Sequence, residues 1–195
     1  MTRMHHGWRI GLTLAMGLTF AVRPDAAAVK AKAHFDKAFD FTQVRTWQWN
    51  PQGAGQVIAA RTQNDDRDLV RQRAEPVILE EVATQMKRRG LALATAAPDV
   101  TLTYYLIMTA GTSAQTAGQF LPAVTDWGLP PFTPSTTALE AIEQGTLVLD
   151  LSAKERVVWR GTGEAGFTMD TDLKKRAALL REAITKVLEK YPPKK

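Results

Sequence analysis

The sequence of 195 residues contains no cysteine. This absence excludes disulfide bonds, thiol nucleophiles, iron–sulfur clusters and zinc sites built on thiolates. It also excludes the acylated cysteine that tethers many exported bacterial proteins to a membrane. Histidine is scarce as well, and the three are His5, His6 and His34. Because a metal site needs several converging ligands, the sequence predicts neither a metal ion nor another cofactor.

Long apolar runs are also scarce, and the one at the start of the chain resembles an export signal. Arg3 and Arg9 precede an uncharged run over residues 10–22, and small alanines end at Ala28. This order is typical of a secretory signal peptide over residues 1–28. The run is shorter than the roughly 20 residues of a membrane span, so an uncleaved anchor is the less favoured alternative. We expect cleavage near Ala28 and a periplasmic or otherwise exported mature protein.

Charge is moderate and of both signs. The formal net charge is +5, and 45% of the residues are hydrophobic, which suits one globular domain over residues 29–195. Removing the first 28 residues lowers the charge to about +3. Because the basic residues are scattered rather than striped, we expect no nucleic-acid partner.

The clearest pattern is a hairpin followed by a helix. Residues 147–151 and 157–160 alternate as two strands across a short polar break, for which we expect a type I turn. Residues 161–166 then read as a glycine-rich connection. Apolar residues spaced by threes and fours predict a helix from Leu173 to Tyr191, capped by Asp170 and Thr171 and stopped by Pro192.

The first half of the mature chain gives weaker patterns. Residues 29–37 read as a lead-in, residues 44–49 as a strand, and residues 57–60 as a short extended piece. Pro76 favours a helix that starts near Glu75 and ends at Gly90, and the aspartates before it read as caps. Residues 100–109 alternate as the longest strand.

These elements predict an α+β fold. We expect a two-layer α/β sandwich, with a mixed sheet of about four strands and two helices on one of its faces. The strands before and after the first helix would be parallel neighbours. A long loop rich in Pro, Gly and Thr would span residues 110–144.

That long loop supplies the candidate functional residues. Phe120, Trp127 and Phe132 are large aromatic residues in a segment that is otherwise unsuited to a core. They form either a lid over the sheet or an exposed patch that binds a partner. We therefore name them as partner-binding candidates.

No catalytic constellation stands out. The acids that could form a pair are spread over turns and caps, and they are Asp150, Glu155, Glu164 and Asp170. Sequence does not show two of them facing one cleft, so we assign no catalytic residues. We expect Trp159 to fill the core against Leu149 and the last helix, and Arg160 to point to solvent.

The chain resembles a bacterial envelope family known as domain of unknown function 4136. The resemblance lies in residues 36–49, residues 98–105 and the order of residues 145–151, 157–161 and 191–193. It implies an exported protein, often a lipoprotein, with a small α/β arrangement and no established activity. Without the lipidation cysteine, a soluble periplasmic form is favoured.

From these patterns we expect an exported, non-catalytic envelope protein. It would bind another envelope component, either a protein or a polymer, or help to assemble it. The alternative is a hydrolase that uses carboxylates on an envelope polymer. The sequence does not indicate an oligomeric state.

Overall fold

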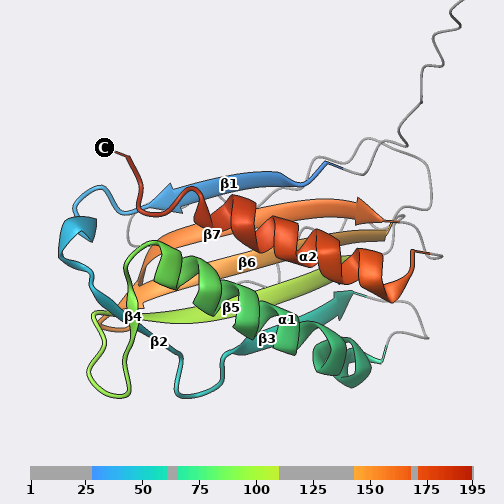
Figure 1. The fold of residues 1–195 in the computed structure, drawn as a ribbon, viewed down its shortest axis with the longest axis horizontal. Coiled ribbons are helices and arrows are strands. Elements are labelled where there is room, and N and C mark those ends of the chain that lie inside the picture. Colours follow the sequence, from blue (N-terminus) through green and yellow to red (C-terminus); the bar gives the residue numbers. More distant parts are fainter. Residues whose placement is uncertain (1–27, 61–65, 110–142, 168–170, 195) are drawn as a thin grey trace, which may run out of the picture.

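A mixed sheet of seven strands carries two helices across one face (Figure 1). The computed structural model describes residues 28–60, 66–109, 143–167 and 171–194. Its strands are β1 (Lys30–Phe35), β2 (Thr46–Trp49), β3 (Gly55–Ala60), β4 (Ala92–Leu93), β5 (Val100–Thr109), β6 (Glu143–Ala153) and β7 (Arg156–Phe167). The helices are α1 (Arg67–Arg88) and α2 (Leu173–Leu188), and a single 3-10 turn, η1, covers Phe41–Gln43.

The strands are ordered β1-β7-β6-β5-β2-β4, and β3 pairs with β5 beyond the end of β2. The pairs β5–β6, β6–β7 and β7–β1 are antiparallel, whereas β2 and β3 run parallel to β5. The expected parallel pairing across the first helix is thus confirmed. The β6–β7 turn holds Lys154 and Glu155 at φ 49° and 66°. Two positive φ values are the pattern of a type I′ turn, so the expected type I turn is wrong.

The α+β class and the two helices are confirmed, but the expected four strands are too few. Strand β1 lies where a lead-in is expected, because its alternating residues are lysine and alanine, which have low strand propensity. Its inward residues Ala31 and Ala33 lie opposite Gly163 and Gly161 of β7. Small residues meet there because α2 packs closely over this part of the sheet.

The same close approach explains why β7 is longer than expected. A Cβ on Gly161 would lie 2.4 Å from Val187 Cγ1, and one on Gly163 would lie 2.9 Å from Val187 Cγ2. Glycine at these positions therefore makes room for α2 and does not mark a loop. The residues expected to form a connection, 161–166, are strand. Residues 143 and 144, expected in the long loop, begin β6.

Both helices begin at aspartate caps. The Asp66 carboxylate accepts hydrogen bonds from the N–H groups of Asp68 and Leu69, so α1 starts eight residues before the expected Glu75 and Pro76 lies inside it. The Asp172 carboxylate accepts from Lys175 N at 2.8 Å and caps α2. Asp172 thus takes the role expected of Asp170, which lies outside the described residues, and of Thr171.

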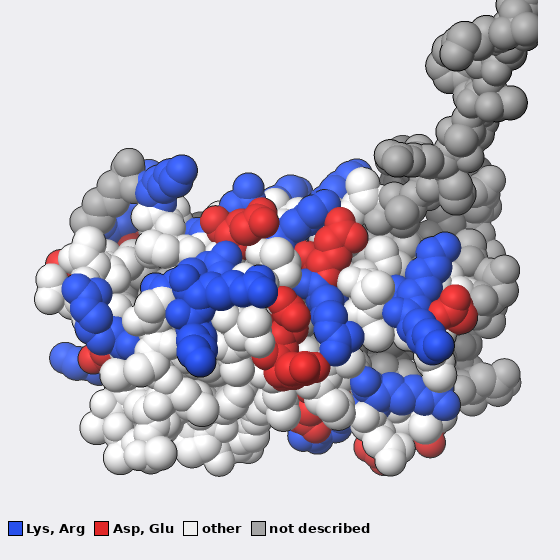
Figure 2. Space-filling model, viewed as in Figure 1, with Lys and Arg blue, Asp and Glu red and all other residues white. Residues whose placement is uncertain are grey.

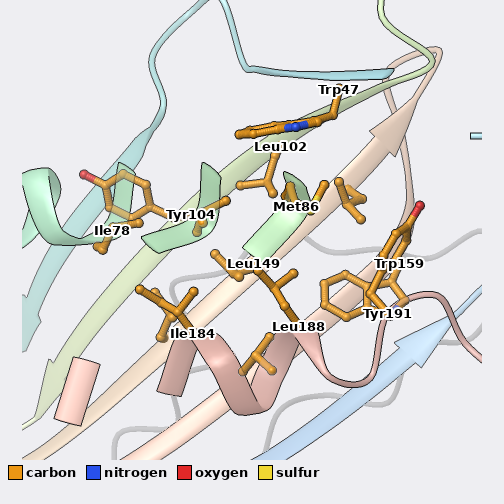
Figure 3. Packing of buried hydrophobic residues seen from close by; sticks show 14 of the residues in the cluster. Trp47, Ile78, Met86, Leu102, Tyr104, Leu149, Trp159, Ile184, Leu188 and Tyr191 are labelled. Atoms are coloured by element: carbon orange, nitrogen blue, oxygen red, sulfur yellow. The ribbon is translucent and has the colours of Figure 1, made fainter. Parts of the chain in front are cut away.

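The main core fills the space between the sheet and the helices (Figure 3). It contains Trp159, which is fully buried and packs edge-on against Tyr191 at a centroid distance of 5.5 Å. Leu149 and Ile184 belong to the same cluster. The expectation that Trp159 packs in the core with Leu149 and the last helix is confirmed.

Arg160 does not point to solvent. It is 5% exposed and lies directly opposite Asp150 on the face of the sheet away from the helices. Its Nε donates to Asp150 Oδ1 at 2.6 Å and its terminal NH2 donates to Oδ2 at 2.5 Å. The alternation of the strand correctly places Arg160 on the face away from the helices. That face is buried at this position, so the arginine needs a carboxylate partner.

Candidate functional site

An apolar cleft opens between the two helices above the sheet. Its volume is about 350 Å³. The N-terminal halves of α1 and α2 form its walls, and β5, β6 and β7 form its floor. The described lining residues are Val70, Arg73, Ala74, Val77, Leu106, Met108, Gly145, Leu147, Gly163, Ala165, Leu173, Arg176, Ala177, Leu179, Leu180 and Ala183.

The far end of the cleft is closed by polar contacts between the C-terminal halves of the helices. Gln85 Nε2 donates to Thr185 Oγ1 at 3.1 Å, and Arg89 Nε donates to the Leu188 carbonyl oxygen at 2.7 Å. Arg89 also donates to Gln85 O at 2.9 Å, and its partial burial lowers its pKa. These contacts hold the helices together at that end.

Small residues keep the cleft open. Gly145 and Ala165 lie on the floor, while Ala74 and Ala177 lie on opposite walls. Where small side chains face each other, the surfaces of helix and sheet stay apart and the space between them is not filled. The cleft is therefore a consequence of residue size at a few facing positions.

The mouth of the cleft combines a cationic and an apolar side chain. Arg73 and Arg176 are the charged members of the described lining. Arg73 is exposed and forms no ion pair with any described residue, whereas Arg176 Nε donates to the Thr171 carbonyl oxygen at 2.9 Å. Leu173, in the first turn of α2, is 55% exposed although it is apolar.

A carboxylate beside the cleft is already engaged. Glu75 accepts hydrogen bonds from Arg71 Nε at 3.1 Å and from the Tyr104 hydroxyl at 2.9 Å. The Arg71 contact lowers the pKa of Glu75, and burial together with Glu75 raises the pKa of Tyr104. Three hydrogen bonds thus hold the Glu75 carboxylate ionised, and its lowered pKa makes it a weak base for proton transfer.

The acids considered from the sequence do not come together. Asp150 is paired with Arg160, and Glu155 lies in the β6–β7 turn. Glu164 lies opposite Thr146, four positions along β6 from Asp150, which is a separation of roughly 13 Å along the strand. Asp170 lies outside the described residues. Within the described ranges, His, Asp and Glu form no group of three able to hold a metal ion.

The partner-binding candidates Phe120, Trp127 and Phe132 also lie outside the described residues and stay a prediction. Sequence reasoning missed the cleft instead. It identified the apolar stripe of α2, but the first half of that stripe, from Leu173 to Leu180, lines the cleft while Ile184 and Val187 enter the core. The signal that could have found the cleft is that small residues on the helices lie opposite small residues on the strands. This can be seen only when it is known which helices pack on which strands.

Acidic and basic side chains alternate over the helix-bearing face, and neither sign gathers there (Figure 2). This distribution differs from the continuous basic stripe that binds a nucleic-acid backbone. None of the described helices is long and apolar enough to cross a membrane.

Two solved structures align with this chain at low identity. A PDZ domain protein from Parabacteroides distasonis aligns at 12% identity with a TM-score of 0.49, over 87% of this chain and 38% of its own. This chain thus spans well under half the length of that protein. The PelC dodecamer from Paraburkholderia phytofirmans aligns at 12% identity with a TM-score of 0.38, over 83% of this chain and 95% of its own.

Among curated proteins, none matches this sequence. A family model described as "Domain of unknown function (DUF4136)" matches residues 31–193. The match covers both helices and all seven strands except the first residue of β1. The chain therefore belongs to the DUF4136 family, as the resemblance of its motifs implied.

Proposed function

We propose that this protein is an exported component of the cell envelope that binds an amphipathic envelope molecule without catalysing a reaction. The apolar cleft between α1 and α2 is the observation that carries the proposal. A volume of about 350 Å³ and a mainly hydrophobic lining with few polar groups are typical of small-molecule sites. A ligand that binds this cleft in the folded state alone would also stabilise the fold.

Export is supported by the position of the first strand. Val29 is buried and β1 begins at Lys30, directly after the expected cleavage site at Ala28. The family match begins at residue 31. A leader that ends at Ala28 would leave the folded domain complete.

The engagement of the carboxylates supports binding rather than hydrolysis. Asp150 and Glu75 are each held by an arginine, and Glu164 is too far from Asp150 to share a scissile bond with it. The cleft lining adds no described acid. A carboxylate-dependent hydrolase is therefore the weaker proposal.

The proposal is tested with an apolar fluorescent probe such as 1-aminoanthracene. We expect the purified protein to bind it, and Ala177→Phe, which fills the cleft from one wall, to abolish binding. Ala178→Phe is the matched control, because Ala178 is exposed and is not part of the lining. Ala74→Leu fills the cleft from the opposite wall and serves if Ala177→Phe does not fold. Equal binding by all the variants would contradict the proposal.

A further inference from the structure

The lining and the mouth of the cleft together define a class of ligand. We infer that the cleft holds the single aliphatic chain of a free anionic amphiphile, a carboxylate of the fatty-acid type, with its head group at Arg73. This inference rests on the proposed function and specifies its ligand. It follows from the size of the cleft, its length, its apolar lip and the charge at its mouth.

Size limits the ligand to one chain. The volume of about 350 Å³ lies near the lower end of the range of roughly 300–1,000 Å³ for small-molecule sites. The α2 wall runs from Leu173 to Ala183, about 15 Å at 1.5 Å per residue. An extended chain of roughly twelve to thirteen carbons has this length, because a zigzag of bonds of about 1.5 Å advances about 1.3 Å per bond. Two acyl chains side by side would exceed the space.

Polarity favours an aliphatic ligand inside the cleft. Its floor is made of Leu106, Met108, Leu147 and small residues, none of which has a side-chain hydrogen-bonding group other than the weak thioether acceptor. A sugar or peptide placed there would lose its hydrogen bonds to water without replacement. An aliphatic chain loses none, and it gains the contacts that the open space lacks.

Charge at the mouth selects the head group. The neighbouring cation Arg71 is paired with Glu75, and the Asp172 carboxylate is engaged as the α2 cap. Arg73 forms no such pair with a described residue, and it is part of the cleft lining. The exposed Leu173 on the facing helix provides an apolar surface at which a chain can enter. A carboxylate at the end of the chain would meet the Arg73 guanidinium in its preferred two-pronged geometry.

The test compares three ligands of one chain length: dodecanoate, dodecanol and dodecylamine, each below its micelle concentration. They compete with 1-aminoanthracene for binding to the purified protein. The protein is expressed from the full-length gene, including its own first 28 residues. We expect dodecanoate to bind about fivefold more tightly than dodecanol, the factor for one exposed ion pair, and dodecylamine to bind most weakly.

Arg73→Gln should remove the preference of dodecanoate over dodecanol. Arg88→Gln is the matched control, because Arg88 is an exposed arginine in the last turn of the same helix, away from the cleft. The preference should persist in that control. Mass spectrometry of the protein as purified should find a single-chain carboxylate.

The outcomes separate the two proposals. If the probe binds and Ala177→Phe blocks it, but the three ligands compete equally or Arg73→Gln leaves the preference unchanged, the ligand class is wrong and the binding function stands. A two-chain phospholipid bound in equal molar amount would also overturn the ligand class. If the probe does not bind, or binds all cleft variants equally, the binding function itself fails.

Discussion

The Asp150–Arg160 pair is the one described ion pair with both side chains almost fully buried, at 3% and 6% exposure. Burial raises the pKa of the Asp150 carboxyl, and the contact with Arg160 opposes that rise. The two charges lie on paired strands, so each removes the penalty of burying the other. The pair therefore contributes by mutual dependence rather than by net stabilisation.

Removing one partner of this pair should cost more than removing both. We expect Arg160→Met to lower the free energy of unfolding by about 3–5 kcal/mol, because Asp150 is left as a buried charge. Asp150→Leu combined with Arg160→Met should cost clearly less. Urea denaturation of the two variants measures the difference, and equal losses would contradict this account.

The pH dependence of the Arg160→Met variant has a definite sign. Without Arg160, burial alone acts on Asp150 and its folded pKa stays above the unfolded value of about 3.9. The variant should therefore be closest to the unaltered protein at pH 4, where the carboxyl can be protonated. It should lose stability as the pH rises through the folded pKa. A difference between the proteins that is constant from pH 4 to 8 would show that Asp150 is not the cause.

Trp159 combines a stabilising and a destabilising effect. Its ring is fully buried, but its Nε1–H has no described hydrogen-bond partner. Trp159→Ala should cost about 3–5 kcal/mol through lost burial and the cavity that remains. Trp159→Phe should cost less, since it keeps an aromatic ring against Tyr191 and removes an unpaired donor. Denaturation midpoints give both values. An unchanged midpoint for the alanine variant would show that Trp159 is not a core residue.

At the scale of elements, Asp99 joins the start of β2 to the start of β5. Its Oδ2 accepts from Arg45 N at 2.9 Å, from Thr46 N at 2.8 Å and from Thr46 Oγ1 at 2.8 Å. These hydrogen bonds lower the pKa of Asp99, and the two from backbone N–H groups have the largest effect. Its contribution to stability is therefore complete above the unfolded value of about 3.9 and is lost as the pH falls through the lower folded value.

Asp99→Asn should remove the part of the stability that is lost when Asp99 is protonated. The urea midpoint of the unaltered protein should fall more steeply below about pH 4 than that of the variant, because the other carboxylates titrate alike in both proteins. Measurements at pH 6, 4 and 3 are sufficient. Parallel curves for the two proteins would mean that the hydrogen bonds of Asp99 are equally strong whether its carboxyl is ionised or protonated.

The elements that sequence reasoning predicted correctly have strong local signals. Strands β5 and β6 alternate large apolar residues, and the α2 stripe has a clear helical period. Strand β1 and the end of β7 were missed because Ala31, Ala33, Gly161 and Gly163 are small for a reason that lies on another element, namely the approach of α2. The start of α1 was missed because Pro76 was weighed against a distant cap at Asp66.

The candidate site was less predictable for the same reason. A cleft is defined by what its facing residues leave unfilled, and Ala74, Ala177 and Gly145 come from three elements far apart in the sequence. The Asp150–Arg160 pair likewise requires the β6–β7 register, which a bulge between Leu151 and Ser152 shifts. Periodicity identifies which face a residue occupies, but it does not identify what that face meets.

At the scale of the whole molecule, the N-terminal edge of the sheet sets where the proposed leader could be cut. Strand β1 pairs along its full length with β7, and the Val29 carbonyl oxygen accepts from Lys186 Nζ at 3.3 Å. Asp36 continues this edge by donating its N–H to Val158 O at 2.9 Å and by pairing with Arg156 at 3.0 Å. A cut inside β1 would remove these contacts and expose the edge of β7.

For the export that we propose, we expect the mature protein to begin at Val29 or within a residue of it, as read by N-terminal sequencing. A chain lacking residues 1–28 should unfold at the same urea midpoint as the full-length chain, because no described contact is lost. A chain lacking residues 1–35 should unfold at clearly lower urea and self-associate through β7, which size-exclusion chromatography would detect. Equal stability of the two shortened chains would show that β1 does not support the fold, and a cytoplasmic, unprocessed protein would contradict export.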